Sequence, residues 1–160
     1  MPEFSTKPPY IKQISIYFRD KDYKKAFSLS KDFTEAFPDE MVSHFLLAKS
    51  AFWLNDFTTA EEESRKAFNL AKDKDGLAVT GILRACSCYR LRKFRKGMEL
   101  LNLLKTKLPQ REEIAKLKFI FALALHDEQA ALHHLEMLYE INERAASELT
   151  VKLLSRYASA

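Results

Sequence analysis

Apolar residues recur along most of this chain at intervals of three and four, which is the spacing that places them on one face of an α-helix. Phe45, Ala48 and Phe52 show the pattern clearly in the first half of the chain. Two breakers, Pro38 and Pro109, stand where such helical stretches should end, because proline cannot continue a helix. The pattern therefore predicts an all-α fold of about nine helices.

A five-residue motif repeats between successive helical stretches. The segments Asp22–Ala26, Asp56–Ala60 and Lys93–Gly97 each carry an aromatic residue at the second position and a small residue at the fifth. Successive motifs are 34 and 37 residues apart, and a period of this length is typical of stacked helical repeats. The three extra residues are expected in the polar stretch Lys72–Gly76, which its composition indicates to be a loop.

The repeats divide the chain into helix pairs within a single predicted domain, residues 1–160. Asp39 and Asp56 are expected to cap the helices that follow them, because a carboxylate accepts hydrogen bonds from free backbone N–H groups. Beyond Pro109 the motif fades, but two helices joined near His126 and a last helix still follow. The last helix is expected to cap the stack, whose terminal apolar face would otherwise meet water. We expect repeats at residues 7–38, 41–74 and 78–110, a degenerate pair at 111–142 and the capping helix at 143–158.

These helix pairs resemble the tetratricopeptide repeat (TPR) family over about residues 7–110. That family places a small residue midway along the first helix, an aromatic residue near its end, an aromatic residue and an alanine at the start of the second helix, and proline at the exit. The first repeat departs from this pattern at Ile14, the second at Lys72 and the third at Gly97. The matching residues are Tyr17, Tyr23, Ala26 and Pro38, then Leu47, Ala48, Phe57, Ala60 and Ala67, then Ala85, Tyr89, Phe94 and Pro109.

The resemblance implies antiparallel helix pairs stacked into a right-handed superhelix, an α-solenoid, without catalytic activity. In the family, a concave groove lined by the first helix of each pair binds peptides, helices or other proteins. In register with the family, the groove of this chain is expected to be mainly apolar and aromatic. Its partner-binding residues are expected to be Ile11, Phe18, Val42, Phe45, Lys49, Phe52, Trp53, Ile82, Cys86, Tyr89 and Arg90, with Ser15, Arg19 and Val79 beside them.

One ligand class of the family is disfavoured by these residues. Some members hold the C-terminal carboxylate of heat-shock chaperones with a clamp of lysines and asparagines. The corresponding positions of this chain hold Ile11, Ser15, Leu46, Val79 and Leu83, so that clamp is absent.

Trp53 is the only tryptophan, and we expect it to anchor a partner because large rigid aromatic side chains bury much area at little entropic cost. The alternative is that it belongs to ordinary core between helices. An exposed apolar groove needs a cover, which could be a hydrophobic segment of a partner protein, a second copy of the chain in a homodimer, or the chain's own last helix. The leading interpretation is an adaptor, scaffold or chaperone-like module that binds a hydrophobic helix or peptide. A self-associating structural subunit of a larger assembly is the alternative.

Composition and charge refine this interpretation. The 160 residues are 47% hydrophobic and 30% charged with only three glycines, which excludes disorder and leaves no room for a phosphate-binding glycine loop. The net charge is +4, but residues 84–118 contain 11 Lys and Arg against 3 Asp and Glu. This basic segment is expected to be solvated, with an acidic protein, nucleic acid or an anionic membrane as alternative partners. Nucleic acid is disfavoured because no reading motif is recognisable. The basic edge consists of Arg90, Arg92, Lys93, Arg95 and Lys96.

The remaining candidates for chemistry are weak. Cys86 and Cys88 stand one residue apart on a predicted helix, which is poor geometry for a disulfide and too few ligands for a metal. Cys88 is expected to pack between helices, and Glu61–Glu63 is expected only to favour the helix dipole. We expect no enzyme activity, no metal and no cofactor. With no apolar run long enough to span a bilayer and no secretory signal, the expected location is cytoplasmic. The histidines expected at the surface are His126, His133 and His134.

Overall fold

The computed structural model describes residues 4–109 and 111–158, and the regular structure in these two ranges is entirely α-helical. The prediction of an all-α fold is therefore confirmed. Within Lys7–Arg90 and within Phe94–Ala158, consecutive helices pack as antiparallel neighbours. The nine helices of the described ranges are α1 (Lys7–Arg19), α2 (Tyr23–Ala36), α3 (Met41–Trp53), α4 (Phe57–Leu70), α5 (Lys74–Arg90), α6 (Phe94–Lys107), α7 (Glu112–Ala124), α8 (Glu128–Ile141) and α9 (Glu143–Ala158).

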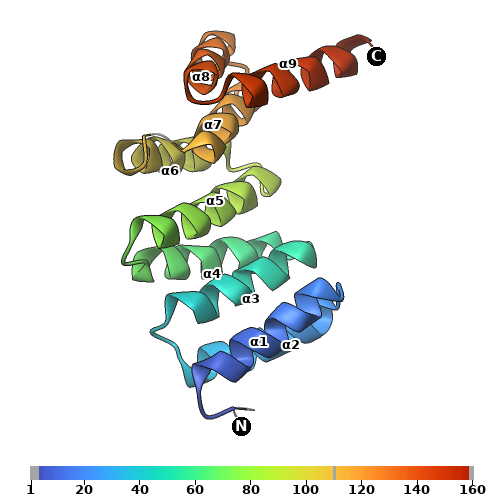
Figure 1. The fold of residues 1–160 in the computed structure, drawn as a ribbon, viewed down its shortest axis with the longest axis vertical. Coiled ribbons are helices and arrows are strands. Elements are labelled where there is room, and N and C mark those ends of the chain that lie inside the picture. The colour runs from blue at the N-terminus through green and yellow to red at the C-terminus, as the bar shows by residue number, and fades with distance from the viewer. Residues whose placement is uncertain (1–3, 110, 159–160) are drawn as a thin grey trace. The chain divides into compact units, whose positions relative to one another are not determined.

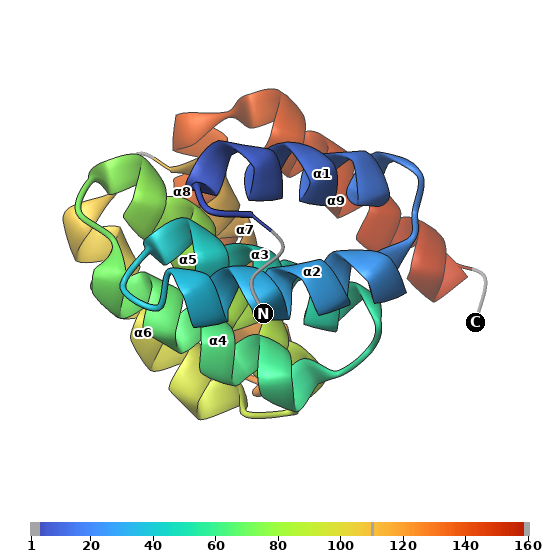
Figure 2. The same ribbon diagram turned by 90° about the horizontal axis from the view of Figure 1, so that it is seen from below.

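The helices form two compact units, with the division between Lys93 and Phe94. Unit 1 contains α1 to α5 and unit 2 contains α6 to α9. Within unit 1, the helices follow one another from blue to green in Figure 1, and Figure 2 shows α1 and α2 running side by side. The division falls inside the third predicted repeat, after its first helix. The single domain spanning residues 1–160 stays a prediction.

The same turn joins the two helices of every pair. At each turn one residue adopts the left-handed conformation, with φ between 57° and 63°. The amide that follows it donates to a carbonyl five residues earlier, as Asp22 does to Tyr17 at 2.8 Å and Asp127 does to Ala122 at 2.9 Å. The repeat therefore continues beyond Pro109, where its sequence pattern fades. The left-handed residues are Lys21, Asn55, Arg92 and His126, at intervals of 34, 37 and 34.

Aspartates begin the second helices α2, α4 and α8, whereas Lys93 precedes α6. The carboxylate of Asp56 accepts a hydrogen bond from the Thr59 amide at 3.2 Å, which confirms its predicted capping role. Asp39 does not cap α3, because the residue at the cap is Glu40, which makes no capping hydrogen bond through its side chain. The prediction for Asp39 was therefore wrong. Asp22 and Asp127 repeat the role of Asp56.

The predicted loop Lys72–Gly76 is shorter than expected, because α5 already begins at Lys74. The carboxylate of Asp73 accepts a hydrogen bond from the Gly76 amide at 2.6 Å and so starts the helix inside the polar stretch. Gly76 is buried within the first turn of α5 and does not end a loop. Composition alone indicated a loop, whereas the aspartate cap decides where the helix begins.

Buried rings and small residues make up the core of each unit. In unit 1, the ring of Tyr10 on α1 stacks on that of Phe33 on α2, with centroids 4.8 Å apart. The alanines of the repeat pattern are also buried, as Ala26 and Ala60 illustrate with no exposed surface. In unit 2, the core includes Phe121, Leu138 and Ala146 together with Phe119, Ala122 and Ala131.

Candidate protein-binding face

The first helices of the pairs in unit 1 adjoin one another. Helix α3 packs directly against α5. On its other side, the Lys49 ammonium of α3 lies 4.7 Å from the centre of the Phe18 ring of α1. We call the surface formed by the predicted groove residues of these helices the α1–α3–α5 face.

Large apolar side chains that remain exposed in unit 1 are confined to this face. Within residues 4–93 they are Trp53 at 54% exposure, Val79 at 44%, Tyr89 at 38% and Ile11 at 36%. All four occupy positions expected to face the groove, whereas α2 and α4 carry no exposed large apolar side chain among the described residues. Exposure on the first helices alone is the arrangement that a binding face requires.

The other predicted groove residues are mostly half-buried. Phe18, Val42 and Phe45 pack partly against the core cluster around Tyr10 and Ile14. The interpretation of these aromatic residues as inter-helix core therefore holds for part of each side chain. The half-buried positions are Phe18, Val42, Phe45, Lys49, Phe52, Ile82 and Cys86, and Arg90 is exposed.

Aromatic rings form a connected series beside the turns of unit 1. The indole of Trp53 lies nearly parallel to the Tyr23 ring, with centroids 5.5 Å apart and planes 12° apart. Phe52 meets Trp53 edge-on at 6.3 Å and meets Phe57 edge-on at 5.3 Å. Phe18 extends the series, with its ring 6.0 Å from that of Tyr23. Each contact joins residues near a helix end, so the repeat motif itself places the rings together.

This series holds its exposed members in fixed positions. Tyr23 covers one face of the Trp53 indole, and Phe52 supports its edge, so little rotamer freedom remains to be lost on binding. The stacking also repeats along the chain. At the equivalent place in the next pair, the Arg90 guanidinium lies 4.5 Å from the centre of the Phe57 ring. A cation–π contact there replaces the aromatic stack.

Positively charged side chains border the α1–α3–α5 face, and the Cys86 thiol within it is unreactive. Lys49 and Arg90 both lie over aromatic rings, so each presents a positive charge beside apolar surface. Burial raises the pKa of the Cys86 thiol, which keeps it protonated at neutral pH. Cys86 and Cys88 are both free thiols, and Cys88 is buried as expected. The face therefore offers apolar contact and positive charge.

The five residues of the basic edge are all exposed. Arg90 ends α5, Arg92 and Lys93 form the connection, and Arg95 and Lys96 lie in the first turn of α6. Of these, Arg90 also belongs to the α1–α3–α5 face through its contact with Phe57.

A buried polar network in unit 1 was missed from sequence. His44 on α3 is hydrogen-bonded through Nδ1 to the Glu63 carboxylate of α4 and through Nε2 to the carbonyl oxygen of Pro38, both at 2.6 Å. Lys66 donates to the other carboxylate oxygen of Glu63 at 2.8 Å. Carboxylate and carbonyl oxygens are both acceptors, so each ring nitrogen of His44 faces a hydrogen-bond acceptor. The expectation that Glu61–Glu63 only favours a helix dipole was wrong.

Sequence contained a weak signal for this network. Glu63 is three residues after Ala60 and four before Ala67, two buried alanines, and so falls on the buried side of α4. A carboxylate at such a position requires a buried partner, but nothing in the sequence singled out His44.

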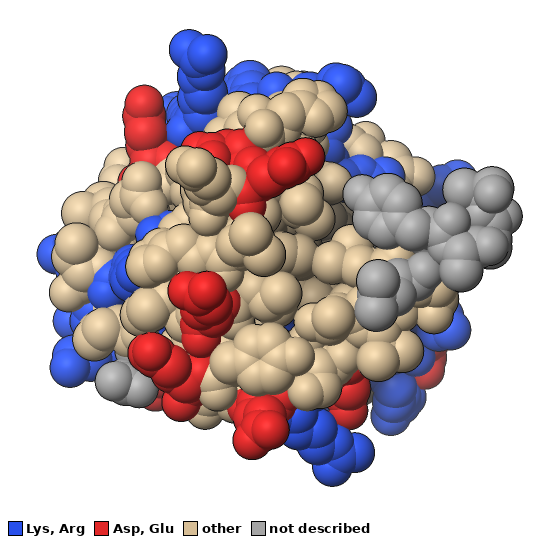
Figure 3. Space-filling view, turned by 90° about the horizontal axis from the view of Figure 1, so that it is seen from above, with Lys and Arg blue, Asp and Glu red and all other residues tan. Residues whose placement is uncertain are grey.

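Unit 2 has exposed apolar residues of its own. In the space-filling view of Figure 3, uncharged residues cover most of the visible surface, with Lys and Arg mainly at its margin. Exposed large apolar residues of unit 2 are Leu103, Leu132, Tyr139 and Val151. His126 and His133 are exposed as expected, but His134 is half-buried, so the surface prediction was wrong for that residue.

Residues 4–109 and 111–158 show neither a cluster of metal ligands nor a membrane-spanning helix. No group of three or more His, Cys, Asp or Glu side chains in residues 4–109 and 111–158 converges as metal ligands do. None of the described helices has the length and apolar character needed to cross a membrane.

Comparison with known proteins finds likeness in fold alone. No family model and no curated protein matches the chain by sequence. The structure of MamA from residue 41 to its end, from Desulfovibrio magneticus RS-1, superimposes with a TM-score of 0.75 over 94% of each chain at 9% identity. A double mutant of RS-1 MamA gives 0.74 over 94% of this chain and 93% of that one, also at 9% identity. The crystal structure of YrrB, a TPR protein with an unusual peptide-binding site, gives 0.42 over 92% of each chain at 9% identity.

Proposed function

We propose, on the premise that this chain has the fold of a tetratricopeptide-repeat protein, that it is a non-catalytic module that binds a hydrophobic helix or peptide of a partner protein. The binding surface is the α1–α3–α5 face. One observation carries the proposal: within residues 4–93, the exposed large apolar side chains all lie on the first helices of the pairs.

Trp53 is the anchor of this proposed site. Its indole is held by Tyr23 and Phe52 yet remains 54% exposed. Rigid aromatic side chains with one free face often dominate binding at protein interfaces. Truncating such a residue to alanine often costs about 2 kcal/mol or more of binding free energy. Phe45, Val79 and Tyr89 extend the apolar surface around it, and Lys49 and Arg90 orient a partner through charge.

Affinity capture with a matched pair of variants tests the proposal. Trp53→Glu places a charge at the anchor, and Leu132→Glu places the same charge at an exposed apolar residue of unit 2. We expect a partner captured by the wild-type chain to be retained by Leu132→Glu and lost by Trp53→Glu, with equal helical circular dichroism for all three proteins.

The outcome also separates the alternatives. Full retention of the partner by Trp53→Glu would exclude the α1–α3–α5 face as the site. A wild-type dimer in light scattering that Phe52→Glu dissociates would instead identify a second copy of the chain as the occupant.

A further inference from the structure

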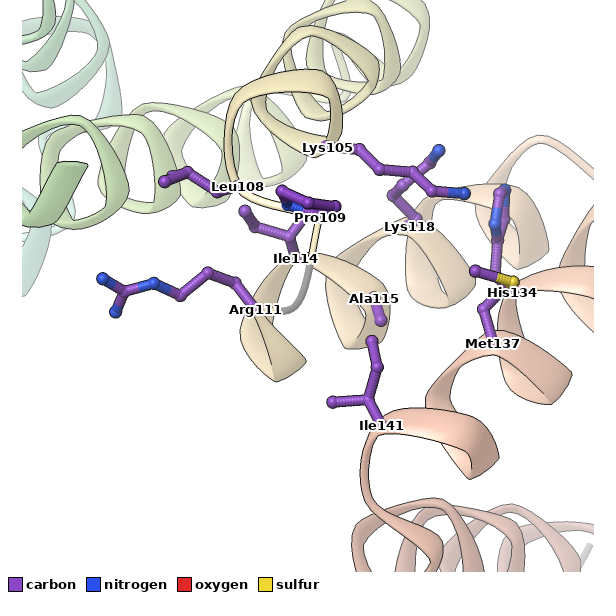
Figure 4. A pocket seen from close by; sticks show the side chains of 10 residues that line it. All are labelled: Lys105, Leu108, Pro109, Arg111, Ile114, Ala115, Lys118, His134, Met137 and Ile141. Carbon is purple, nitrogen blue, oxygen red and sulfur yellow. The ribbon is translucent and has the colours of Figure 1, made fainter.

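Unit 2 contains a pocket that the proposed binding face does not use. It lies between α6, α7 and α8, with Lys105 on α6, Lys118 on α7 and His134 on α8 (Figure 4). Six of the ten lining residues are apolar, and none of the ten is acidic. The apolar lining residues are Leu108, Pro109, Ile114, Ala115, Met137 and Ile141.

Lys118 is an unusual residue for such a place. Its side chain is 5% exposed on the buried side of α7, and no hydrogen bond or ion pair joins its ammonium group to another described residue. In Figure 4, the side chains of Lys105 and Lys118 both extend toward the side of the pocket where His134 lies. A lysine with so little exposed surface and no counter-charge beside it is costly, so this arrangement favours an anion between these groups.

Electrostatics of the surrounding groups agree with this geometry. Burial, and then repulsion from Lys105, lower the pKa of Lys118. Burial first, and then the nearby Lys118, His133 and Lys105, together lower the pKa of His134 to about 4, against an opposing effect of Asp127. The lining therefore has Lys105, Lys118 and Arg111, together with an imidazole that is neutral at pH 7 and can donate one hydrogen bond.

We propose that this pocket binds a carboxylate group carried on a short aliphatic stem. Lys118 and Lys105 supply the opposing charge, and the N–H of the neutral His134 ring supplies a hydrogen bond. Met137 and Ile141 cover the methylene groups of the stem. This function is additional to the proposed partner binding and uses none of its residues.

The lining favours a carboxylate over a phosphate. The interior space amounts to about 10 Å³, which is about what one water-sized group requires. Either anion could place one oxygen there, so the choice between them depends on what contacts the rest of the ligand. Because most lining residues are apolar, they favour a ligand with methylene groups to bury, and inorganic phosphate has none.

Titration of the full chain with butyrate tests the proposal, using NMR shifts of the His134 ring and the melting temperature. Acetate, inorganic phosphate and sodium chloride at equal ionic strength serve as comparison ligands. We expect saturable butyrate binding in the millimolar range, several-fold tighter than acetate. Binding should raise the pKa of His134 from about 4 and raise the melting temperature by a few degrees. A titration with N-acetylglutamate α-amide compares the affinity of a glutamate side-chain carboxylate with that of butyrate.

Lys118→Met is the decisive variant, and Lys107→Met, an exposed lysine near the end of α6, is its control. Lys118→Met should melt at a higher temperature without ligand, because it removes a buried unpaired charge, and should bind butyrate at least tenfold more weakly. Lys107→Met should behave as wild type. The proposal fails if butyrate acts no differently from sodium chloride, if phosphate binds more tightly than butyrate, or if Lys118→Met binds butyrate as the wild type does.

Discussion

At the scale of single residues, buried polar groups distinguish this chain from a plain stack of amphipathic helices. His44 and Glu63 are 9% exposed each and join α3 to α4 through a short hydrogen bond. His44 also holds the carbonyl group of Pro38 in the connection between α2 and α3. Such a network fixes how helices meet, because each member is costly to bury without its partners.

Glu63 gives a prediction for the pH dependence of stability. Burial acts to raise the pKa of Glu63, but hydrogen bonds from Lys66 and His44 outweigh it and lower the pKa below 4.5. A carboxyl group with a depressed pKa stabilises the fold above its unfolded pKa and loses this contribution as pH falls through the folded pKa. The stabilisation is therefore present at pH 7 and lost below about pH 4.5.

We expect Glu63→Gln to lower the free energy of unfolding by about 1 to 3 kcal/mol at pH 7, because the buried His44 ring and the Lys66 ammonium lose the carboxylate that they contact. The difference from wild type should shrink as urea unfolding is repeated below pH 4.5. Glu62→Gln is the control, since Glu62 is exposed and lies 3.6 Å from Lys66. Equal effects of the two variants would contradict the role assigned to the network.

At the scale of helices, close approach in unit 2 depends on one glycine. A Cβ atom added to Gly97 on α6 would overlap the Phe121 ring on α7, because the nearest ring atom would be only 2.1 Å away. The sequence showed Gly97 where the TPR pattern has alanine. The structure gives the reason: Phe121 is fully buried and occupies the space that the alanine methyl would take.

Gly97→Ala should therefore destabilise the protein by roughly 1 to 3 kcal/mol, although alanine is the better helix former. Gly76→Ala is the comparison, because its added Cβ would meet the flexible end of the Met41 side chain at 3.0 Å. Urea unfolding should show the larger loss for Gly97→Ala. A stabilised Gly97→Ala protein would show that α6 and α7 are not packed as described.

Much of the helical layout could be predicted from the sequence, because apolar spacing and the motif around Tyr23 and Phe57 reflect local geometry. The fourth turn was harder, since His126 adopts the left-handed conformation that glycine or asparagine usually marks. Contacts between side chains of different helices leave almost no pattern in the local sequence. Lys118 stands four residues after Ile114 and three before Phe121, which places it on a buried stripe, but its neighbours Lys105 and His134 belong to other helices.

At the scale of the whole molecule, the two units carry different features. Unit 1 has the aromatic α1–α3–α5 face, and unit 2 has the cationic pocket. The charge follows a similar division along the chain, because residues 1–80 contain 12 Lys and Arg against 13 Asp and Glu, whereas residues 81–160 contain 14 against 9. The TPR-like fold is confirmed by the likeness to MamA, whereas the residues of the binding face stay a prediction.

Fluorescence of Trp53 tests the central claim most directly, because this residue is the only tryptophan and is the most exposed large apolar side chain of the proposed binding face. The measurement is its emission and its quenching by acrylamide, with and without a saturating amount of a tryptophan-free segment of the captured partner. Burial of the exposed indole face should shift the emission to shorter wavelength and reduce quenching several-fold. Unchanged emission and quenching at saturation would contradict binding at the α1–α3–α5 face.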